Sequence, residues 1–251
     1  MPRSNLAALR GEPSYVWRAG QERRLKMIAH WARLDHARVL EAGGGVGVYA
    51  AQIGQRYPTA LVEMFDMEIE RVREGRRDTP HGVVAAAEHL PYASDYFDTI
   101  LSSDVIEHVA DDYAAASEMV RVLKPGGRIV LFTPNRWYPF ETHGHYWRGE
   151  YHFGNTPLIN YLPDPLRDRL APHVRTYTAR GLRRLFASCP VRILTHQRIF
   201  AGYDNIIARL GRAGRILRDT LYALEGTPLD FWAYSHMLVV EKLANQAEEA
   251  N

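Results

Sequence analysis

Three segments of the 251-residue sequence contain residue types that bind ligands or move protons. The first is EAGGGVG, residues 41–47, in which an acid precedes alternating glycines. The second is DVIEH, residues 104–108, and the third is ETHGHYW, residues 141–147. Glycines let a backbone approach a ligand closely, whereas carboxylates and imidazoles exchange protons or bind metal ions. The combination indicates a small-molecule site with groups suited to acid–base chemistry.

The glycine-rich segment follows an apolar run and precedes a helical pattern, which predicts a strand-to-helix loop. In a dinucleotide fingerprint the third glycine comes three residues after the second. Here Gly47 comes two residues after Gly45, and Glu41 precedes Gly43. This spacing favours a compact nucleoside with an amino-acid tail, because its ammonium group pairs with nearby acceptors. A tight turn that binds no ligand is the alternative.

A second ligand-binding element is expected at Asp66, the last residue of an apolar run at 60–66. A carboxylate at this point can accept hydrogen bonds from both ribose hydroxyls. It can also cap the helix predicted to follow it, and both roles can hold at once. Met67 is placed to pack on an adenine face, although filling the core with a flexible side chain is the alternative.

Apolar runs of strand length alternate with helical patterns, which predicts βαβ units and a parallel sheet. After residue 135 the regularity ends in a proline- and aromatic-rich insertion at 136–178. The expected strands are 37–43, 60–66, a short strand within 82–90, 97–105, 128–134, 191–200 and 235–243. The expected helices are 14–34, 45–57, 68–77, 112–123, 179–189 and an arginine-rich helix at 205–223, with a turn at 124–127.

Four segments together resemble the class I S-adenosylmethionine-dependent methyltransferases, in the methyltransferase type 11 branch that includes ubiquinone- and menaquinone-type enzymes. They are EAGGGVG, FDME, AAAEHLPYASDYFDTILSSDVIEHV and RVLKPGGRIVLFTPN. The resemblance covers residues 36–135 and continues more weakly through 179–200 and 235–243. It implies a Rossmann-like three-layer αβα sandwich. The sheet of that fold has seven mostly parallel strands in the order 3-2-1-4-5-7-6, the seventh antiparallel.

The resemblance also implies S-adenosylmethionine as the cofactor. Glu41 and the backbone of Gly43 would lie near its methionine end, in the loop that contains Gly45 and Gly47. Asp66 would bind the ribose, next to Met67.

The adenine contact departs from the family pattern. An aspartate of the family's D-A-x-x-L segment is replaced here by Ala86, so the backbone of Ala87 or the side chain of Glu88 is expected to substitute. Ser103 and Asp104 would face the methionine moiety and the substrate.

Methyl transfer from a sulfonium is an in-line displacement, and a base is needed only if the acceptor loses a proton. Glu107 and His108 are the candidate catalytic residues. Together with Asp104 they resemble the E-x-x-E-H pattern of ubiquinone-type O-methyltransferases, in which a divalent metal is implicated. The sequence is compatible with three roles for His108: a base, a metal ligand, or a residue that only caps the loop. A metal is not part of the expected cofactor set.

The segment after the fifth expected strand supplies candidates for binding the acceptor: His143, His145, Tyr146 and Trp147. Loops at the carboxyl ends of parallel strands carry ligand sites in open α/β sheets. On an extended segment His143 and His145 would share one face. A lid whose rings bury one another is the alternative.

The net charge of +2 conceals a basic segment, because residues 136–218 contain 14 arginines and only 5 acids. This distribution favours an acceptor or carrier that is anionic or lipid-linked. The helix expected at 205–223 places arginine at every third position from 209 to 218, which suits either a peripheral membrane contact or a solvated face. The sequence contains no RNA-binding module, so a nucleic-acid partner is not expected. Nothing in it indicates an oligomeric state.

The expected organisation is a single methyltransferase domain over residues 1–251. It comprises a helical lead at 1–35, a cofactor-binding core at 36–135, a cap at 136–178 and a C-terminal part at 179–251 with a basic helical insertion at 201–230. Cys189 is the only cysteine, which excludes an intrachain disulfide. Neither a signal peptide nor a membrane-spanning run is recognisable, so a cytoplasmic protein is expected.

The expected function is methyl transfer to an oxygen, nitrogen or carbon atom of a small molecule. Two alternatives remain open at this point. One is an NAD(P)-dependent Rossmann enzyme, and the other is a methyltransferase-like protein that binds the cofactor without turnover.

Overall fold

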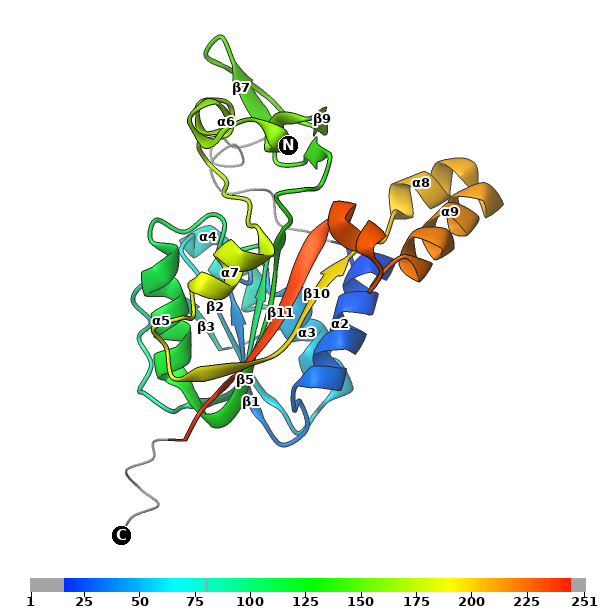
Figure 1. Cartoon of the computed structure of the whole chain (residues 1–251). Helices are drawn as coiled ribbons and strands as arrows, with labels where there is room; N and C mark the ends of the chain where they lie inside the picture. The colour runs from blue at the N-terminus through cyan, green and yellow to red at the C-terminus, as the bar shows by residue number, and fades with distance from the viewer. Residues whose placement is uncertain (1–15, 80, 245–251) are drawn as a thin grey trace.

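A seven-stranded sheet forms the centre of the computed structural model, which describes residues 16–79 and 81–244 of the chain (Figure 1). The strands are β1 (Arg38–Ala42), β2 (Leu61–Asp66), β3 (Gly82–Val84), β4 (Phe97–Ser103), β5 (Leu123–Pro134), β10 (Val191–Ile199) and β11 (Ser235–Lys242). Their spatial order is β3-β2-β1-β4-β5-β11-β10. Numbered along the chain, this is 3-2-1-4-5-7-6, which confirms the expected order. β11 is antiparallel to both β5 and β10, whereas the other neighbours are parallel.

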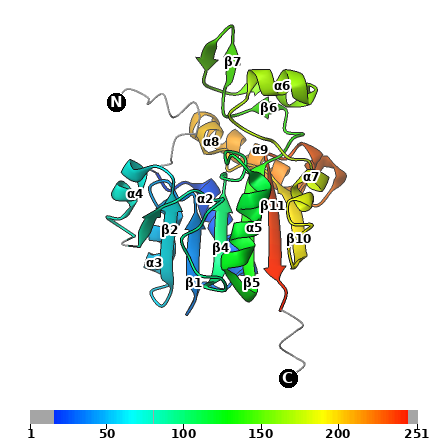
Figure 2. The ribbon, with the colours of Figure 1, turned by 90° about the vertical axis from the view of Figure 1, so that its left-hand side faces the viewer.

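Helices cover both faces of the sheet and make a three-layer αβα sandwich (Figure 2). They are α2 (Ala19–Trp31), α3 (Val48–Arg56), α4 (Ile69–Gly75), α5 (Asp112–Val122) and α7 (Ala179–Arg184). Alternate residues of the central strands are buried on opposite faces. Val39 packs in one cluster with side chains of α2 and α3, whereas Leu40 packs in another with side chains of α5 and α7. Burial on both faces explains why the strands are almost continuously apolar.

Residues 136–178, which we call the cap, lie beyond the carboxyl ends of the parallel strands (Figures 1 and 2). The cap contains two short antiparallel ladders and two short helices. Its elements are β6 (Phe140–Glu141) paired with β9 (Thr156–Pro157), β7 (His145–Trp147) paired with β8 (Glu150–His152), the 3-10 helix η1 (Ile159–Tyr161) and α6 (Asp164–Leu170).

The arginine-rich segment differs from its prediction, because it is two helices rather than one. α8 (Asp204–Leu210) and α9 (Arg212–Ala223) are separated by Gly211, whose φ of 53° and ψ of −117° cannot continue an α-helix. The predicted arginine row is therefore divided between two helices that pack together, and a 3-10 helix, η2 (Pro228–Trp232), leads from them to β11.

Several other boundaries were predicted too long. The short strand expected within 82–90 is confirmed as Gly82–Val84, whereas the helix expected at 179–189 ends at Arg184, after which the backbone N–H groups bond to carbonyls three residues earlier instead of four. The lead helix expected at 14–34 spans Ala19–Trp31, and positions 14 and 15 of that prediction lie outside the described residues. The segment at 124–127 is a bulge within β5 rather than a separate turn, because the pairing with β4 skips it.

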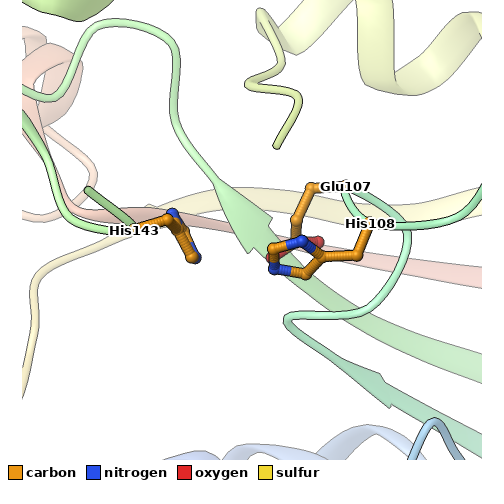
Figure 3. Close-up of side chains that lie close together, drawn as sticks. All are labelled: Glu107, His108 and His143. Atoms are coloured by element: carbon orange, nitrogen blue, oxygen red, sulfur yellow. The ribbon is translucent and has the colours of Figure 1, made fainter. Parts of the chain in front are cut away.

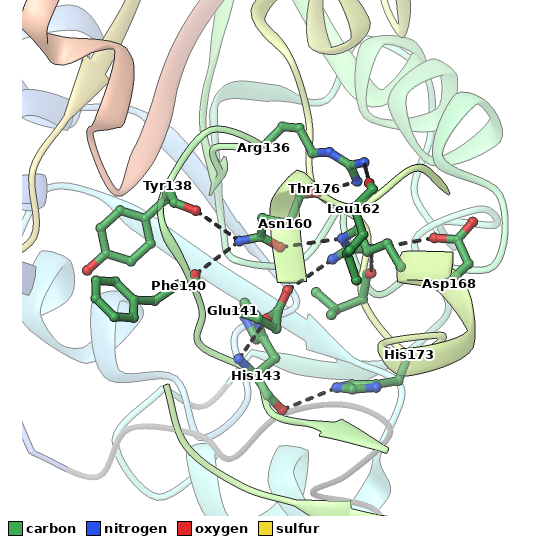
Figure 4. Close-up of polar contacts among 12 residues, drawn as sticks. Arg136, Tyr138, Phe140, Glu141, His143, Asn160, Leu162, Asp168, His173 and Thr176 are labelled. Atoms are coloured by element: carbon green, nitrogen blue, oxygen red, sulfur yellow. Dashed lines mark hydrogen bonds and ion pairs between the residues drawn. The ribbon is translucent and has the colours of Figure 1, made fainter. Parts of the chain in front are cut away.

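A buried ion pair holds the cap together (Figure 4). Arg167 of α6 is 2% exposed, and its guanidinium lies 3.0 Å from the Glu141 carboxylate. It also donates to the carbonyl of Val174 at 2.8 Å and to the amide oxygen of Asn160 at 3.4 Å. Asn160 in turn donates to two backbone carbonyls of the cap, at 3.0 and 3.2 Å. A charge this deeply buried is stable only because its hydrogen-bonding groups are matched.

Arg167→Leu should therefore destabilise the protein by about 3–5 kcal/mol, because it leaves the Glu141 carboxylate buried without its cation. Arg169→Leu is the matched control: Arg169 lies on the same helix but is exposed, so its loss should change stability by about 0.5 kcal/mol or less. Urea-induced unfolding of both variants tests this, and equal effects would show that the buried pair has no special role.

Candidate active site

A cavity of about 1080 Å³ opens where the carboxyl ends of β1, β2 and β4 face the cap. Cavities at this edge are the usual ligand sites of open α/β sheets. Its walls include residues of α2, of the segments that follow β1, β2 and β4, of the cap, and of the segment just before β11. Those discussed below are Arg24, Glu41, Gly43, Gly45, Tyr49, Asp66, Met67, Ala86, Ala87, Glu88, Ser103, Asp104, His108, His143, Tyr151, Phe153 and Tyr234.

The glycine loop between β1 and α3 lines the cavity through Gly43 and Gly45, as predicted. Gly43 has a φ of +62°, and a Cβ there would lie 2.6 Å from the side chain of Val105. Gly47 is different: it does not line the cavity, and a Cβ there would lie 2.6 Å from the sulfur of Met64. The structure thus places Gly47 in the packing of the loop on the sheet, and its predicted cofactor contact stays a prediction.

Glu41 is 5% exposed at the end of β1 and accepts a hydrogen bond from the backbone N–H of Ala50 at 2.7 Å. It therefore binds the amino end of α3, where backbone N–H groups lack helical partners. Burial raises the pKa of Glu41 to about 8, because it disfavours the charged carboxylate. A cation placed in the cavity would favour ionisation of this acid.

Asp66 joins two loops at the end of β2. One carboxylate oxygen accepts from the N–H of Gly45 at 3.0 Å, and the other accepts from the N–H of Glu68 at 2.9 Å. Asp66 thus fixes the turn that precedes α4 and lines the cavity, but the N-cap residue of α4 is Glu68, so the prediction that Asp66 caps this helix is wrong. Met67 beside it is 51% exposed and lines the cavity, so filling the core is not its role.

Ala86, Ala87 and Glu88 form the wall next to Asp66. One carboxylate oxygen of Glu88 accepts from the N–H groups of Ala110 and Asp111, at 2.7 and 3.1 Å. Glu88 therefore fixes the loop that precedes α5 to this wall.

Asp104 follows β4 with a φ of +57°, a conformation that few non-glycine residues adopt. Its carboxylate pairs with Arg24 of α2, which also donates to the hydroxyl of Ser103 at 2.8 Å. Burial raises the pKa of Asp104, but the guanidinium of Arg24 lowers it by more, so the net pKa lies below its usual value. Sequence reasoning missed Arg24, because nothing in the helical pattern distinguishes it from the other basic residues of α2.

Glu107, His108 and His143 come together at the cap end of the cavity (Figure 3), and we call them the His–Glu cluster. One nitrogen or oxygen atom from each side chain lies within 4.8 Å of the others. Asp104 is not part of this group, because its carboxylate is paired with Arg24, so the structure does not bring together the predicted candidate set Asp104, Glu107 and His108.

The two imidazoles of the His–Glu cluster are each fixed through Nδ1. The Nδ1 of His143 lies 3.1 Å from the carboxylate of Glu141, and that of His108 lies 3.1 Å from the carbonyl of His173. Since both partners only accept, each Nδ1 carries the hydrogen. Burial lowers the pKa of His143, but the carboxylates of Glu141, Glu107 and Asp104 together raise it by more, so the net pKa is raised. Burial lowers the pKa of His108 to about 4.

Three of the predicted acceptor-binding residues lie outside the cavity. Gly144, with a φ of +85°, turns the chain after His143, so the prediction that His143 and His145 share one face is wrong. His145 stacks on His152 with ring centres 5.4 Å apart. Tyr146 packs against rings of the cap, and Trp147 is 56% exposed. His145 and Tyr146 therefore match the alternative prediction of a lid whose rings bury one another.

Other residues of the cavity wall had no signal in the sequence. Tyr151 and Phe153 follow the predicted histidines in the cap, and Tyr234 immediately precedes β11. Tyr49 is buried at the start of α3. In the sequence these aromatic residues have the type and spacing expected of residues in the hydrophobic core. Only the folded structure shows that they line one cavity.

A sheet of this order, with a glycine loop after its first strand, an acid at the end of its second and a cavity between them, defines the S-adenosylmethionine-dependent methyltransferase fold. The family model described as a methyltransferase domain matches residues 40–131. Residues 40–131 are thus similar to a methyltransferase domain, and the chain has the fold of these enzymes.

Curated relatives agree with this assignment. Ubiquinone/menaquinone biosynthesis C-methyltransferase UbiE of Proteus mirabilis (strain HI4320) is 38% identical over 105 residues, which span 38% of this chain and 41% of that protein. UbiE of Cupriavidus metallidurans is 32% identical over 148 residues, 52% of this chain and 60% of the relative. The chain therefore spans about two fifths to three fifths of the length of these relatives.

Solved structures share the fold over most of the chain. An S-adenosylmethionine-dependent methyltransferase from Mesorhizobium loti is 18% identical with a TM-score of 0.62, covering 89% of this chain and 98% of that one. The [4+2]-cyclase SpnF is 17% identical with a TM-score of 0.61, covering 93% of this chain and 85% of that one. Geranyl diphosphate C-methyltransferase from Streptomyces coelicolor A3(2) is 14% identical with a TM-score of 0.60, covering 89% and 81%.

Glu41→Gln should make the ligand-free protein more stable at high pH. Because the pKa of about 8 lies above the ordinary value of 4.5, the folded state binds this proton more tightly than the unfolded state does. The resulting stabilisation is complete below pH 4.5 and is lost as the pH rises to about 8. Glutamine keeps an acceptor for the Ala50 N–H without titrating.

Thermal unfolding measures the difference. The variant and the native protein should agree near about pH 5, and the variant should unfold several degrees higher near about pH 9. A difference in melting temperature that does not change with pH would contradict the raised pKa.

Proposed function

We propose that this chain transfers a methyl group from S-adenosylmethionine to a small-molecule acceptor. The observation that carries the proposal is the continuity of the cavity, which runs from the glycine loop and Asp66 past Asp104 to His108 and the cap's His143. A cofactor and an acceptor thus have space side by side, which in-line transfer requires.

The residues present fit the cofactor. Gly43 and Gly45 let the loop backbone approach it, and the buried acid Glu41 offers an acceptor for the ammonium of its amino-acid end. Asp66 has each carboxylate oxygen fixed by one backbone N–H, which leaves further acceptor capacity for ribose hydroxyls. Bound there, S-adenosylmethionine supplies an activated methyl group on a positively charged sulfur. Arg24 and Ser103 hold Asp104 in position beside it.

The acceptor would bind between Asp104 and the cap. His108 has an unprotonated Nε2 when neutral, so it can accept a proton from an acceptor that must lose one. Tyr151 and Phe153 provide aromatic surface on the cap side. The relatives named for ubiquinone and menaquinone biosynthesis, and the fold neighbour named for geranyl diphosphate, support a lipid-like acceptor.

Of the two other functions considered, the dinucleotide enzyme is disfavoured by the methyltransferase-domain match. The match does not exclude a protein that binds the cofactor without methyl transfer, because a [4+2]-cyclase also has this fold. Incubation of cell extract with isotopically labelled S-adenosylmethionine and the protein, followed by mass spectrometry, distinguishes the two and identifies the acceptor. Transfer of label to no small molecule would favour the non-catalytic protein.

Asp66→Ala should weaken binding of S-adenosylhomocysteine by about tenfold or more, because a charged hydrogen-bond acceptor is removed from the ribose site. His108→Ala should weaken it by about threefold or less, since His108 lies toward the acceptor side. Isothermal titration calorimetry measures both constants. Equal effects would contradict the assigned roles, and no binding to the native protein at millimolar ligand would overturn the proposed cofactor.

We propose in addition that the α8–α9 hairpin (residues 204–223) meets an anionic membrane. None of the described arginines of residues 136–218 lines the cavity, so the basic charge of this segment acts elsewhere. Arg209, Arg212 and Arg215 are exposed on the hairpin, and Leu210 and Ile216 beside them are 59% and 58% exposed. Exposed arginines next to exposed apolar side chains suit a lipid surface. No helix in the described part of the chain is long and apolar enough to span a membrane.

Co-sedimentation with vesicles tests this contact. The native protein should bind phosphatidylglycerol vesicles and not phosphatidylcholine vesicles, more weakly at high salt. Replacing Arg209, Arg212 and Arg215 with glutamine should reduce binding by about 100-fold, at about 1 kcal/mol per arginine. The same replacement at exposed Arg148, Arg169 and Arg180 is the control. Equal losses of vesicle binding in the two triple variants would indicate a general charge effect and would refute the proposed membrane contact of the hairpin.

A further inference from the structure

We propose that the His–Glu cluster is a binding site for a divalent transition-metal ion, ligated by Glu107, His108 and His143. The three side chains come from two separate parts of the fold. Glu107 and His108 lie in the loop after β4, and His143 lies in the cap (Figure 3). A cation there would link the cap to the core.

The first observation is an oxygen without a partner. Glu107 is 1% exposed, and one of its carboxylate oxygens accepts from the hydroxyl of Thr133 at 3.0 Å. The other, Oε1, is buried and makes no hydrogen bond within the described part of the chain. A buried carboxylate oxygen without a partner is costly, because it has lost its water and gained nothing in exchange. A cation is a partner that a carboxylate oxygen can bind directly.

The second observation is the orientation of the imidazoles. Glu141 and the carbonyl of His173 hold the Nδ1–H groups of His143 and His108, which leaves the Nε2 lone pair of each ring free to bind a ligand. A histidine that ligates a metal through one nitrogen usually donates its other N–H to a carboxylate or a carbonyl. Both of those partners are present here, one on each histidine. Arg167 in turn fixes Glu141.

The third observation is the surroundings. Arg24 lines the same cavity, but its guanidinium is paired with Asp104 and not with Glu107. The ligand atoms are separated by at most 4.8 Å. Ligands about 2.1 Å from one ion lie up to about 4.2 Å apart, so small side-chain rotations close the site.

The donor set indicates the class of ion. Two imidazoles and one carboxylate suit Zn²⁺, Co²⁺ or Fe²⁺, whereas Mg²⁺ and Ca²⁺ prefer oxygen ligands. His108 and His143 line the cavity, so a further coordination position would face the acceptor space. Three protein ligands with one open position are typical of catalytic zinc. If the proposed methyl transfer holds, an ion at this position would bind an oxygen of the acceptor and favour its deprotonation.

Metal titration of the full chain, freed of metal by a chelator and dialysed, tests the site directly. Calorimetry with Zn²⁺ should give one ion per chain, and Co²⁺ should give the visible absorption of a site with nitrogen and oxygen ligands. His143→Ala should weaken Zn²⁺ binding by about 100-fold or more, and Glu141→Gln by about 10-fold through the orientation of His143. Glu107→Gln keeps the side-chain volume and should also lose the site.

His145→Ala is the matched control, because His145 lies two residues from His143 in the same cap but outside the cavity. It should bind Zn²⁺ like the native protein. Equal affinity of His143→Ala and His145→Ala would overturn the proposal, as would the absence of binding to the native chain. Binding of S-adenosylhomocysteine, measured on every variant, confirms folding and separates the two proposals: metal failure with cofactor binding intact refutes only the metal site.

Discussion

The divergence of the chain on either side of β1 is the constraint on which the site depends. β1 lies between β2 and β4, so the loop that leaves β1 and the loop that leaves β4 run toward opposite halves of the sheet. They separate at the carboxyl edge and leave a crevice between them. Gly43 and Glu41 form one side of this crevice, and Asp104 forms the other. Every later contribution, from Arg24 to the cap, is arranged around this opening.

The strands and the loops that line the cavity near Gly43 and Asp66 were predictable from local patterns, whereas the order of the sheet was predictable only from the resemblance to the methyltransferase family. An apolar run followed by glycines predicts a loop wherever it occurs, and Asp66 stands at a strand end that short-range periodicity identifies. Gly47 shows the limit of this reasoning. Its φ of +71° favours glycine, and a Cβ there would also lie 2.6 Å from the sulfur of Met64, which is on the neighbouring strand β2 and has no sequence relation to the glycine motif.

The acceptor side could not be predicted in the same way, because it depends on contacts between distant segments. His143 and His145 are equivalent in sequence, and only the left-handed turn at Gly144 and the Glu141 carboxylate direct one ring inward. Arg24 is separated from Asp104 by 80 positions. The break at Gly211 depends on two backbone angles, which an otherwise continuous amphipathic pattern does not reveal.

The packing of α2 has a consequence for the order of events during synthesis. This helix is translated before every strand of the sheet, yet Leu25 and Ile28 are buried in a cluster that includes Met237 and Val239 of β11. Arg23 of the same helix pairs with Glu225, which also lies far along the sequence. The helix α2 therefore lacks much of its final packing surface until β11 has been translated, so the wall that Arg24 completes forms only after the other six strands have been made.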